Sequence, residues 1–266
     1  MRLLKRIQNY LENRILKYVY KYYEERLLEI VKKGKMPEHV GLILDGNRRW
    51  AMEIGLSPEK GHEVGFEKAK EVLKWCWELG IKVVTIYVLS TENLKRDRRE
   101  LEHLFELIRR GLHEILESKD IDKYKVRIRA IGRLNYLDRN LIDLIRKVEE
   151  RTKQYDDNRL YIAIAYGGRA EIVDATRKIV DAVIKGELKK DDIDETTFSK
   201  FLYTQGDRDP DLIIRTSGEE RLSGFLLWQS AYSELYFADV YWPEIRKIDL
   251  LRAIRTYQKR TRRFGK

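Results

Sequence analysis

Residues 39–50 read HVGLILDGNRRW, an apolar run that ends in an acid and is followed by glycine, asparagine, two arginines and tryptophan. Amphipathic helical patterns separate this run from five comparable strand-like runs, at residues 83–90, 125–132, 160–167, 211–217 and 234–239. Three of the six are nearly continuous apolar runs, which is typical of parallel strands that helices cover on both faces. The alternation predicts an α/β protein: a single domain with a central, mostly parallel six-stranded sheet surrounded by helices.

The helical patterns span residues 66–79, 99–117, 138–155 and 170–185, where apolar residues recur every three or four positions. The patterns between the first three strands are rich in Leu, Ile and Phe, and the first of them contains Trp75 and Trp77. Such side chains form either an ordinary core or the wall of a lipid tunnel, and the sequence leaves both open.

The chain has 266 residues and a net charge of +10, which suits an anionic partner: a phosphorylated substrate, a membrane surface or a nucleic acid. Residues 1–35 hold ten Lys and Arg against four acids, and their apolar residues recur at helical spacing. They predict a basic amphipathic N-terminal helix ahead of a domain at residues 36–266. This helix either contacts a membrane surface peripherally or packs against its own domain or a partner subunit.

The single cysteine, Cys76, excludes a disulfide framework and fits a reducing compartment. No apolar run approaches the roughly 18 residues that a membrane span needs. We therefore expect a cytoplasmic protein that is soluble or peripheral at the membrane.

Polar side chains follow several strands, and right-handed crossovers place the carboxyl ends of parallel strands at one edge of the sheet, where ligands bind. Arginine side chains at this edge match diphosphate oxygens with paired hydrogen bonds. A carboxylate among them, Asp45, is best explained by a divalent cation such as Mg²⁺. A helix start at Gly61 and His62 makes a phosphate contact plausible. A solvated surface explains any one of these loops, but several loops converging on one edge favour a binding site.

The motifs, in their order, resemble the cis-prenyltransferase family, also called the undecaprenyl diphosphate synthase family. The matching stretches are HVGLILDGNRRWA (39–51), GH (61–62), YVLSTEN (87–93), AYGGR (165–169), DLIIRTSGEERLSGFLLWQSAYSELYF (211–237) and WP (242–243). The resemblance covers about residues 36–266. It implies a parallel sheet surrounded by helices, a homodimer, an elongated apolar tunnel and Mg²⁺ as cofactor.

The family condenses isopentenyl diphosphate onto an allylic diphosphate and makes each new double bond cis. The resemblance therefore implies a long-chain, undecaprenyl-type polyprenyl diphosphate as product, the precursor of a glycosyl carrier lipid. The Glu- and Lys-rich composition and the paired arginines of NRRW favour an archaeal-type member. Such a member implies geranylgeranyl diphosphate as primer, with farnesyl diphosphate as the alternative.

The resemblance implies catalytic roles for Asp45 and Asn93 and a metal site at Asp45 and Glu234. Asp45 either holds the metal or helps to remove the proton, and Ser90 and Asn93 resemble a pair that handles the departing proton. The residues implied to bind the substrates are Gly46, Asn47, Arg48, Arg49, Trp50, His62, Ser90, Thr91, Glu92, Leu94, Arg96, Arg215, Arg221, Leu222, Ser223, Arg263 and Gly265.

Two positions depart from the family pattern. Pro58 stands where family members usually carry an arginine, and Lys60 is a candidate substitute. Leu94 replaces an aromatic residue near the prenyl chain, which leaves the preferred primer open.

Three alternatives remain. The first is a short-chain or atypical condensing enzyme, and the second is a non-catalytic scaffold subunit of a synthase. Scaffold subunits lose the aspartate, whereas Asp45 and its arginines are present here. The third is a nucleic-acid binder, but the sequence holds no recognised binding motif, so we expect no nucleic-acid partner.

Overall fold

A computed structural model of the protein describes residues 20–260. Within this range, residues 37–245 form one compact unit, and residues 20–36 together with 246–260 form a second. The predicted domain boundary between residues 35 and 36 stays a prediction. Most of the predicted N-terminal helix, residues 1–19, lies outside the described residues.

The larger unit contains a single sheet of six parallel strands. They are β1 (His39–Ile43), β2 (Val83–Tyr87), β3 (Val126–Ile131), β4 (Asn158–Ala163), β5 (Leu212–Arg215) and β6 (Glu234–Phe237). Their order across the sheet is β3-β4-β2-β1-β5-β6, and every neighbouring pair is parallel. The predicted α/β fold is therefore confirmed, with a sheet that is parallel throughout. All six strands end before the predicted runs do, and the last residues of each run belong to loops.

Four helices correspond to the predicted ones: α3 (Pro58–Glu78), α4 (Arg98–Glu117), α6 (Arg139–Thr152) and α7 (Gly168–Ile184). The sequence did not predict the short helices α2 (Asn47–Glu53), α5 (Lys119–Lys123) and α8 (Glu195–Phe201), nor α9 (Lys247–Lys259) in the smaller unit. α2 was missed because its seven residues bury only Ala51, too little to set a periodic apolar pattern.

α3 begins earlier than predicted. Ser57 caps it by accepting a hydrogen bond from the backbone N–H of Lys60, and Pro58 occupies the first turn. Gly61 and His62 therefore lie inside the helix, and the expectation that they mark its start was wrong.

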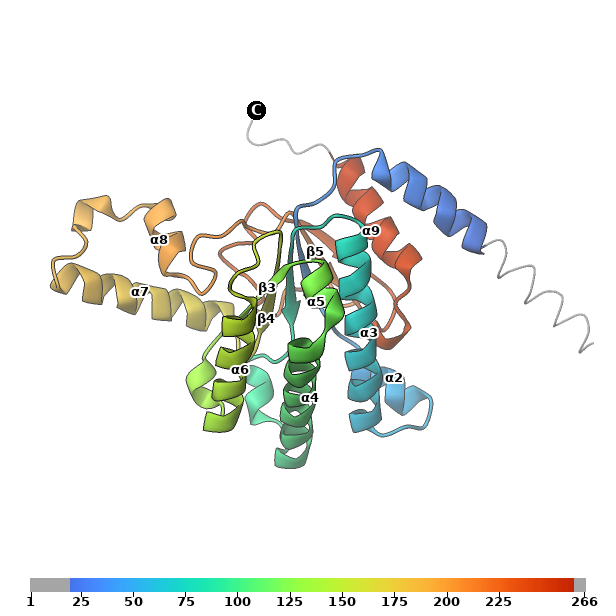
Figure 1. The fold of residues 1–266 in the computed structure, drawn as a ribbon, viewed down its shortest axis with the longest axis horizontal. Coiled ribbons are helices and arrows are strands. Elements are labelled where there is room, and N and C mark those ends of the chain that lie inside the picture. Colours follow the sequence, from blue (N-terminus) through green and yellow to red (C-terminus); the bar gives the residue numbers. More distant parts are fainter. Residues whose placement is uncertain (1–19, 261–266) are drawn as a thin grey trace, which may run out of the picture. The chain divides into compact units, whose positions relative to one another are not determined.

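The two faces of the sheet differ, because side chains alternate along each strand. One face carries Ile43, Tyr161 and Ile213 into a closed core cluster with Phe225 and Leu226. The opposite face carries Ile86, Leu160 and Ile162 towards α3 and α4 and borders a large cavity. Figure 1 shows α3, α4 and α6 side by side, and α7 with α8 as an arm that extends away from them.

In the smaller unit, residues 20–32 are helical and pair with α9. The side-chain amide of Gln258 donates to the carbonyl of Val31 over 2.8 Å, and the guanidinium of Arg246 lies 5.4 Å from the ring centre of Tyr20. Within residues 20–260, no helix combines the length and the apolar character that crossing a membrane requires.

Candidate active site

The site begins at the turn that links β1 to α2. Gly46 has a φ of +104°, and a β-carbon there would lie 2.6 Å from the ring of Tyr241. Both the backbone angle and the space favour glycine. The turn places Asp45 at the carboxyl end of β1 and directs Arg48 and Arg49 from the first turn of α2 into the same region.

Asp45 is paired with arginines from two segments. Its Oδ2 accepts a hydrogen bond of 2.7 Å from Nη2 of Arg215, and its Oδ1 lies 3.5 Å from Nη2 of Arg49. Partial burial alone would raise the pKa of Asp45, but the hydrogen bond and charge of Arg215, with the charge of Arg49, lower it below the ordinary value. Asp45 is therefore ionised at neutral pH.

The strand register explains why Arg215 reaches this position. Arg215 is paired with Ile43 across β5 and β1, so it ends its strand level with the end of β1. Its side chain is only 5% exposed, and its Nη1 donates to Oγ of Ser223 over 2.8 Å and to the carbonyl of Arg221. Within residues 20–260, its buried Nε has no hydrogen-bond partner.

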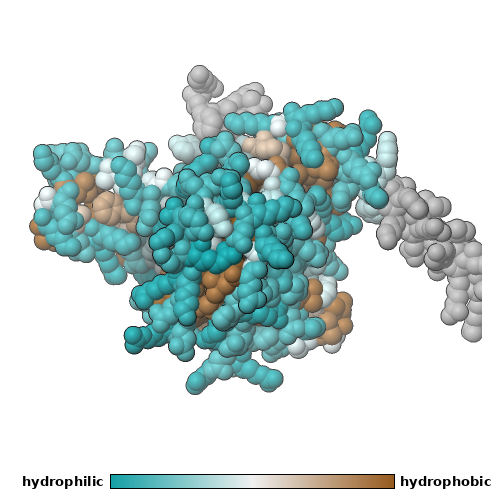
Figure 2. Space-filling model, in the orientation of Figure 1, coloured by the Kyte–Doolittle hydropathy of each residue, from teal (hydrophilic) through white to brown (hydrophobic). Residues whose placement is uncertain are grey.

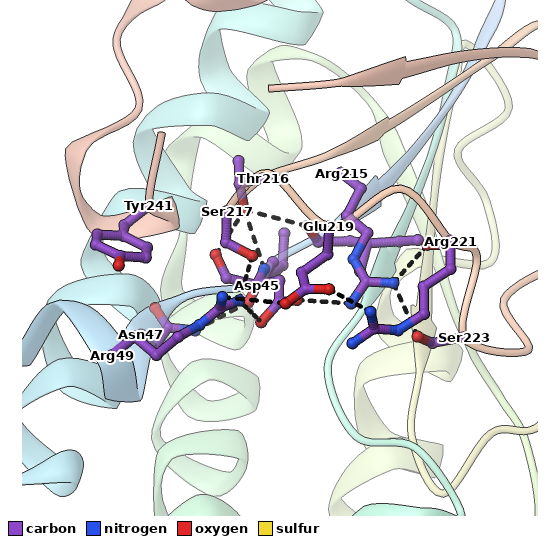
Figure 3. Close-up of polar contacts among 12 residues, drawn as sticks. Asp45, Asn47, Arg49, Arg215, Thr216, Ser217, Glu219, Arg221, Ser223 and Tyr241 are labelled. Atoms are coloured by element: carbon purple, nitrogen blue, oxygen red, sulfur yellow. Dashed lines mark hydrogen bonds and ion pairs between the residues drawn. The ribbon is translucent and has the colours of Figure 1, made fainter. Parts of the chain in front are cut away.

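A second carboxylate, Glu219, stands between Arg49 and a further arginine, Arg221 (Figure 3). Its Oε1 lies 3.1 Å from Nη1 of Arg49, and its Oε2 accepts from Nη1 of Arg221. Nη2 of Arg49 also donates to Oγ of Ser217 over 2.5 Å. The sequence analysis assigned no role to Glu219, although the matching stretch at residues 211–237 contains it.

Glu100 organises another cluster on the α4 side of the site. Its carboxylate lies 2.9 Å from Arg96, 3.3 Å from His62 and 3.5 Å from Arg48. Burial lowers the pKa of His62 and outweighs the hydrogen bond to Glu100, which raises it, so the imidazole is neutral at pH 7. The sequence analysis missed Glu100, because its partners Arg48, His62 and Arg96 come from separate segments that only the fold brings together.

Ser90 and Asn93 hold each other in place after β2. The backbone N–H of Ser90 donates to Oδ1 of Asn93, and the backbone N–H of Asn93 donates to Oγ of Ser90, both over 3.0 Å. This reciprocal bonding fixes the amide of Asn93 beside the cavity. The two residues are therefore brought together as expected, while their part in proton removal stays a prediction.

A cavity of about 850 Å³ runs from these charges into the space beneath α3 and α4. Its mouth is polar, and its deeper walls are apolar, from β2, β4, α3, α4 and α5. The polar lining includes Asp45, Asn47, Arg48, Arg49, His62, Asn93, Arg96, Arg215, Arg221 and Ser223, and the apolar lining includes Leu73, Trp77, Leu104, Ile108, Leu112, Ile115, Ile121, Leu160 and Ile162. The alternative between core and tunnel is thus settled in favour of a cavity, lined by Trp77.

Two glycines of α3, Gly61 and Gly65, let α2 pack closely against α3. A β-carbon at Gly61 would lie 2.2 Å from the carbonyl oxygen of Asn47, and one at Gly65 would lie 2.0 Å from its Oδ1. Only glycine allows α2 and α3 to approach this closely. The helix that carries the arginines is therefore packed directly on the helix that walls the cavity.

Some predicted residues lie outside this cavity. Thr91 donates its backbone N–H to the carbonyl of Tyr166, and Leu222 packs against the closed face. Trp50 is half-buried on α2, and Glu92 and Leu94 lie on a short 3₁₀ helix. Lys60 contacts Glu63 rather than the cavity. Arg263 and Gly265 lie outside the described residues.

The structure does not bring Glu234 to Asp45 within one chain. Glu234 is the first residue of β6 and is in register with Leu212, which pairs with Val40 near the start of β1. The first residue of a parallel strand lies at the amino edge of a sheet, whereas Asp45 follows the carboxyl edge. Within one chain, Glu234 and Asp45 therefore lie at opposite edges of the sheet, and the implied metal role of Glu234 stays a prediction.

A metal ion at this site would depend on Asp45 and on the ligand. Among residues 20–260, no group of three or more His, Cys, Asp and Glu side chains is arranged to hold a metal ion. Oδ1 of Asp45 lies 3.5 Å from Nη2 of Arg49, and the side chain is 30% exposed at the cavity mouth. One carboxylate combined with diphosphate oxygens fits Mg²⁺, which commonly uses one or two carboxylates plus substrate phosphates.

Comparisons with known proteins agree with this site. A family model described as "Putative undecaprenyl diphosphate synthase" matches residues 43–265. The chain is 58% identical over 236 residues to a tritrans,polycis-undecaprenyl-diphosphate synthase (geranylgeranyl-diphosphate specific) of Methanopyrus kandleri, covering 89% of this chain and 87% of the relative. It is 53% identical to an isoprenyl transferase of Thermus thermophilus, covering 89% of this chain and 91% of the relative.

Solved structures give the same result. The crystal structure of lavandulyl diphosphate synthase from Lavandula x intermedia, in complex with dimethylallyl diphosphate, matches with a TM-score of 0.82 and 37% identity, covering 87% of this chain and 99% of the other. The fold, the sequence motifs and these relatives agree, and the chain belongs to the undecaprenyl diphosphate synthase family of prenyltransferases.

Proposed function

We propose that this enzyme condenses isopentenyl diphosphate repeatedly onto an allylic diphosphate, with cis geometry at each new double bond. The observation that carries the proposal is the junction of a cationic mouth with a long apolar cavity. An allylic diphosphate has the matching shape and chemistry, since it joins a strongly anionic head to a hydrocarbon tail. The head fits among Arg48, Arg49 and Arg96, and the tail fits between α3, α4 and the sheet.

The arginines supply the stabilisation that the reaction needs. Breaking the allylic C–O bond leaves both electrons on the diphosphate, where preorganised cationic donors are most valuable. The double bond of isopentenyl diphosphate attacks the electron-poor allylic carbon, a C–C bond forms, and a proton leaves the new chain. Arg215 and Arg221, with Ser223, are placed to hold the diphosphate of the attacking substrate beside that of the primer.

Asp45 is placed to serve both the charge balance and the metal. Its lowered pKa keeps it ionised, so Asp45 and the diphosphate oxygens would hold Mg²⁺ at the mouth. When bound, Mg²⁺ neutralises charge on the departing diphosphate. The apolar walls of Leu104, Ile108 and Ile162 exclude water that would otherwise trap the electron-poor carbon.

We further propose geranylgeranyl diphosphate as primer and an undecaprenyl-type diphosphate, the precursor of a glycosyl carrier lipid, as product. The names of the archaeal relatives support this assignment. The cavity also supports it, because its apolar lining continues past α4 to Ile121 on α5. Farnesyl diphosphate remains the alternative primer.

The test is incorporation of radiolabelled isopentenyl diphosphate by the purified protein with Mg²⁺, supplied with dimethylallyl, farnesyl or geranylgeranyl diphosphate in parallel. We expect long polyprenyl products and the highest kcat/KM with geranylgeranyl diphosphate. Products of one or two added units would favour the short-chain enzyme. No incorporation with any primer would remove the enzyme proposal and favour a scaffold subunit.

We also propose a homodimer that forms through the α7–α8 arm. Val173, Val180 and Ile184 lie on α7 at seven- and four-residue spacing, and each is at least 45% exposed. Figure 2 shows apolar surface on this arm among hydrophilic residues. We expect light scattering to give twice the chain mass, and Val180→Glu with Ile184→Glu to give the monomer. A wild-type chain that stays monomeric at micromolar concentration would contradict the dimer.

A further inference from the structure

Glu219 occupies an unusual position, because its two carboxylate oxygens contact arginines from two distant segments. Oε1 lies 3.1 Å from Nη1 of Arg49, which follows β1, and Oε2 accepts from Nη1 of Arg221, which follows β5. Arg49 and Glu219 are 170 residues apart in the sequence. Figure 3 shows the carboxylate between the two guanidinium groups.

Glu219 approaches the arginines from outside the cavity. Arg49 and Arg221 line the cavity, and Glu219 is not among its lining residues. A guanidinium has five N–H donors, and Glu219 engages one nitrogen of each arginine. Each arginine therefore keeps donors for a ligand while Glu219 stays in place.

The arginines need such a support, because both are long side chains near the surface. The side chain of Arg221 is 62% exposed and that of Arg49 is 44% exposed. Ordering a free arginine side chain costs up to about 2 kcal/mol of rotamer entropy. Arg49 is also held by Ser217 and by the ring of Tyr241, whose centre lies 5.7 Å from its guanidinium carbon. Glu219 therefore ties the more exposed Arg221 to an arginine that is already held in place.

On the proposed function, on which this inference rests, the two arginines serve different substrates. Arg49 faces the diphosphate of the allylic primer, and Arg221 faces that of isopentenyl diphosphate. We propose that Glu219 is a positioning residue that ties the two diphosphate sites into one unit. By fixing the distance between the arginines, it fixes the distance between the carbon that loses diphosphate and the double bond that attacks it.

Glu219→Gln tests the inference, with Glu220→Gln as the matched control. Glutamine keeps the size of the side chain and removes the charge that both guanidinium groups share. Glu220 carries the same charge on the next residue and is exposed. We expect Glu219→Gln to raise the KM for both substrates about five- to tenfold, on the scale of couplings between contacting residues. The variant should also lower kcat and leave the thermal midpoint unchanged, while Glu220→Gln matches the wild type in every respect.

Three results of this experiment would overturn the inference. A change in the KM of one substrate only would assign Glu219 to a single site. A fall in both KM values would show that the Glu219 carboxylate competes with the substrate diphosphates for the arginines and does not position them. Unchanged kinetics in Glu219→Gln would leave Glu219 without a role in either site. The wild type and Glu220→Gln distinguish failure of this inference from failure of the proposed function. If the proposed function is wrong, both proteins are inactive; if only the inference is wrong, both are active.

Double variants and a titration without turnover sharpen the test. In the Arg221→Lys background, Glu219→Gln should raise the KM for isopentenyl diphosphate by less than it does in the wild type. In the Arg49→Lys background, Glu219→Gln should likewise raise the KM for the primer by less. Calorimetric titration with inorganic pyrophosphate should show weaker binding to Glu219→Gln than to Glu220→Gln. Additive kinetic effects would contradict this role of Glu219. Equal pyrophosphate affinities would also contradict it, and they can be measured without turnover.

Discussion

The two faces of the sheet are built from the same six strands, yet one is closed and the other is hollow. On the closed face, Ile213 and Tyr161 pack with Phe225 into a continuous cluster. On the hollow face, Ile86 and Ile162 face a cavity of about 850 Å³ under α3 and α4. A filled face contributes more apolar burial, and therefore more stability, than a face beside a void. The closed face therefore stabilises the fold, which lets the other face remain open for a ligand.

The largest expected effect is the loss of chemistry at the mouth of the hollow face. Asp45→Asn removes the charge that pairs with Arg215 and Arg49, and we expect kcat to fall by about 10²–10³. Stability should change much less, because the site is partly exposed. Steady-state assays and urea unfolding measure the two effects. Wild-type turnover in Asp45→Asn would show that Asp45 takes no part in the reaction.

A matched pair of substitutions tests the faces directly. Ile213→Ala removes a side chain that is 1% exposed on the closed face, and we expect a loss of about 2–5 kcal/mol in the free energy of unfolding. Ile162→Ala makes the same chemical change beside the cavity, so fewer packing contacts are lost and the cost should be smaller. Urea titrations of both variants give the comparison. Equal costs would mean that the two faces are packed alike.

The closed side also carries a buried histidine with a predictable pH effect. His39 lies between Oγ1 of Thr85, 2.8 Å away, and the carbonyl of Arg208, 2.6 Å away. Burial lowers its pKa from the ordinary 6.5 to about 4. Between pH 6.5 and 4 the unfolded chain binds a proton at this residue and the folded chain does not, so stability falls as the pH falls through this window.

The expected contribution of His39 to this fall is about 3 kcal/mol, from about 1.4 kcal/mol per pKa unit. The difference between wild type and His39→Asn, measured by unfolding at a series of pH values, isolates it from the carboxylates. A His39→Asn variant with the same pH slope as the wild type would show that the imidazole is not held neutral in the fold.

The smallest expected effect on stability comes from adding bulk to the hollow face. Leu112 is 2% exposed and lines the cavity from α4. Leu112→Trp should shorten the polyprenyl products and change the unfolding free energy by less than about 1.5 kcal/mol, because the void accepts the larger ring. Ile213→Trp, on the closed face, should instead destabilise by about 1–3 kcal/mol through overpacking. Product lengths unchanged by Leu112→Trp would place the tail elsewhere.

The sequence predicted the features that depend on periodicity and chain order. The six strands and the residues at their carboxyl ends follow from apolar runs that end in polar residues, as at Asp45 and Arg215. It could not predict Glu100 or Glu219, because each acts through partners that only the fold brings near. It did not show that Glu234 and Asp45 lie at opposite edges of the sheet within one chain. A motif reports which residues occur together in sequence, whereas strand direction decides which edge they reach.

The sequence also left α2 unrecognised, with a consequence for the site. The helix lacks a buried stripe of its own and depends on Gly61 and Gly65 of α3 for its position. A sequence shows such a glycine pair, but only the structure shows that both glycines make room for Asn47 of α2.

The pairing of β1 with β5 has a consequence for the order in which the protein matures. The hydrogen bond between Asp45 and Arg215 joins residues 170 positions apart, and β1 meets β2 long before it can meet β5. Contacts between distant residues form late, and synthesis delivers β5 only after four strands have left the ribosome. A growing chain can thus form much of the apolar hollow before Arg215 and Arg221 reach its mouth. The pairing of β5 with β1 then completes the charged mouth of the cavity.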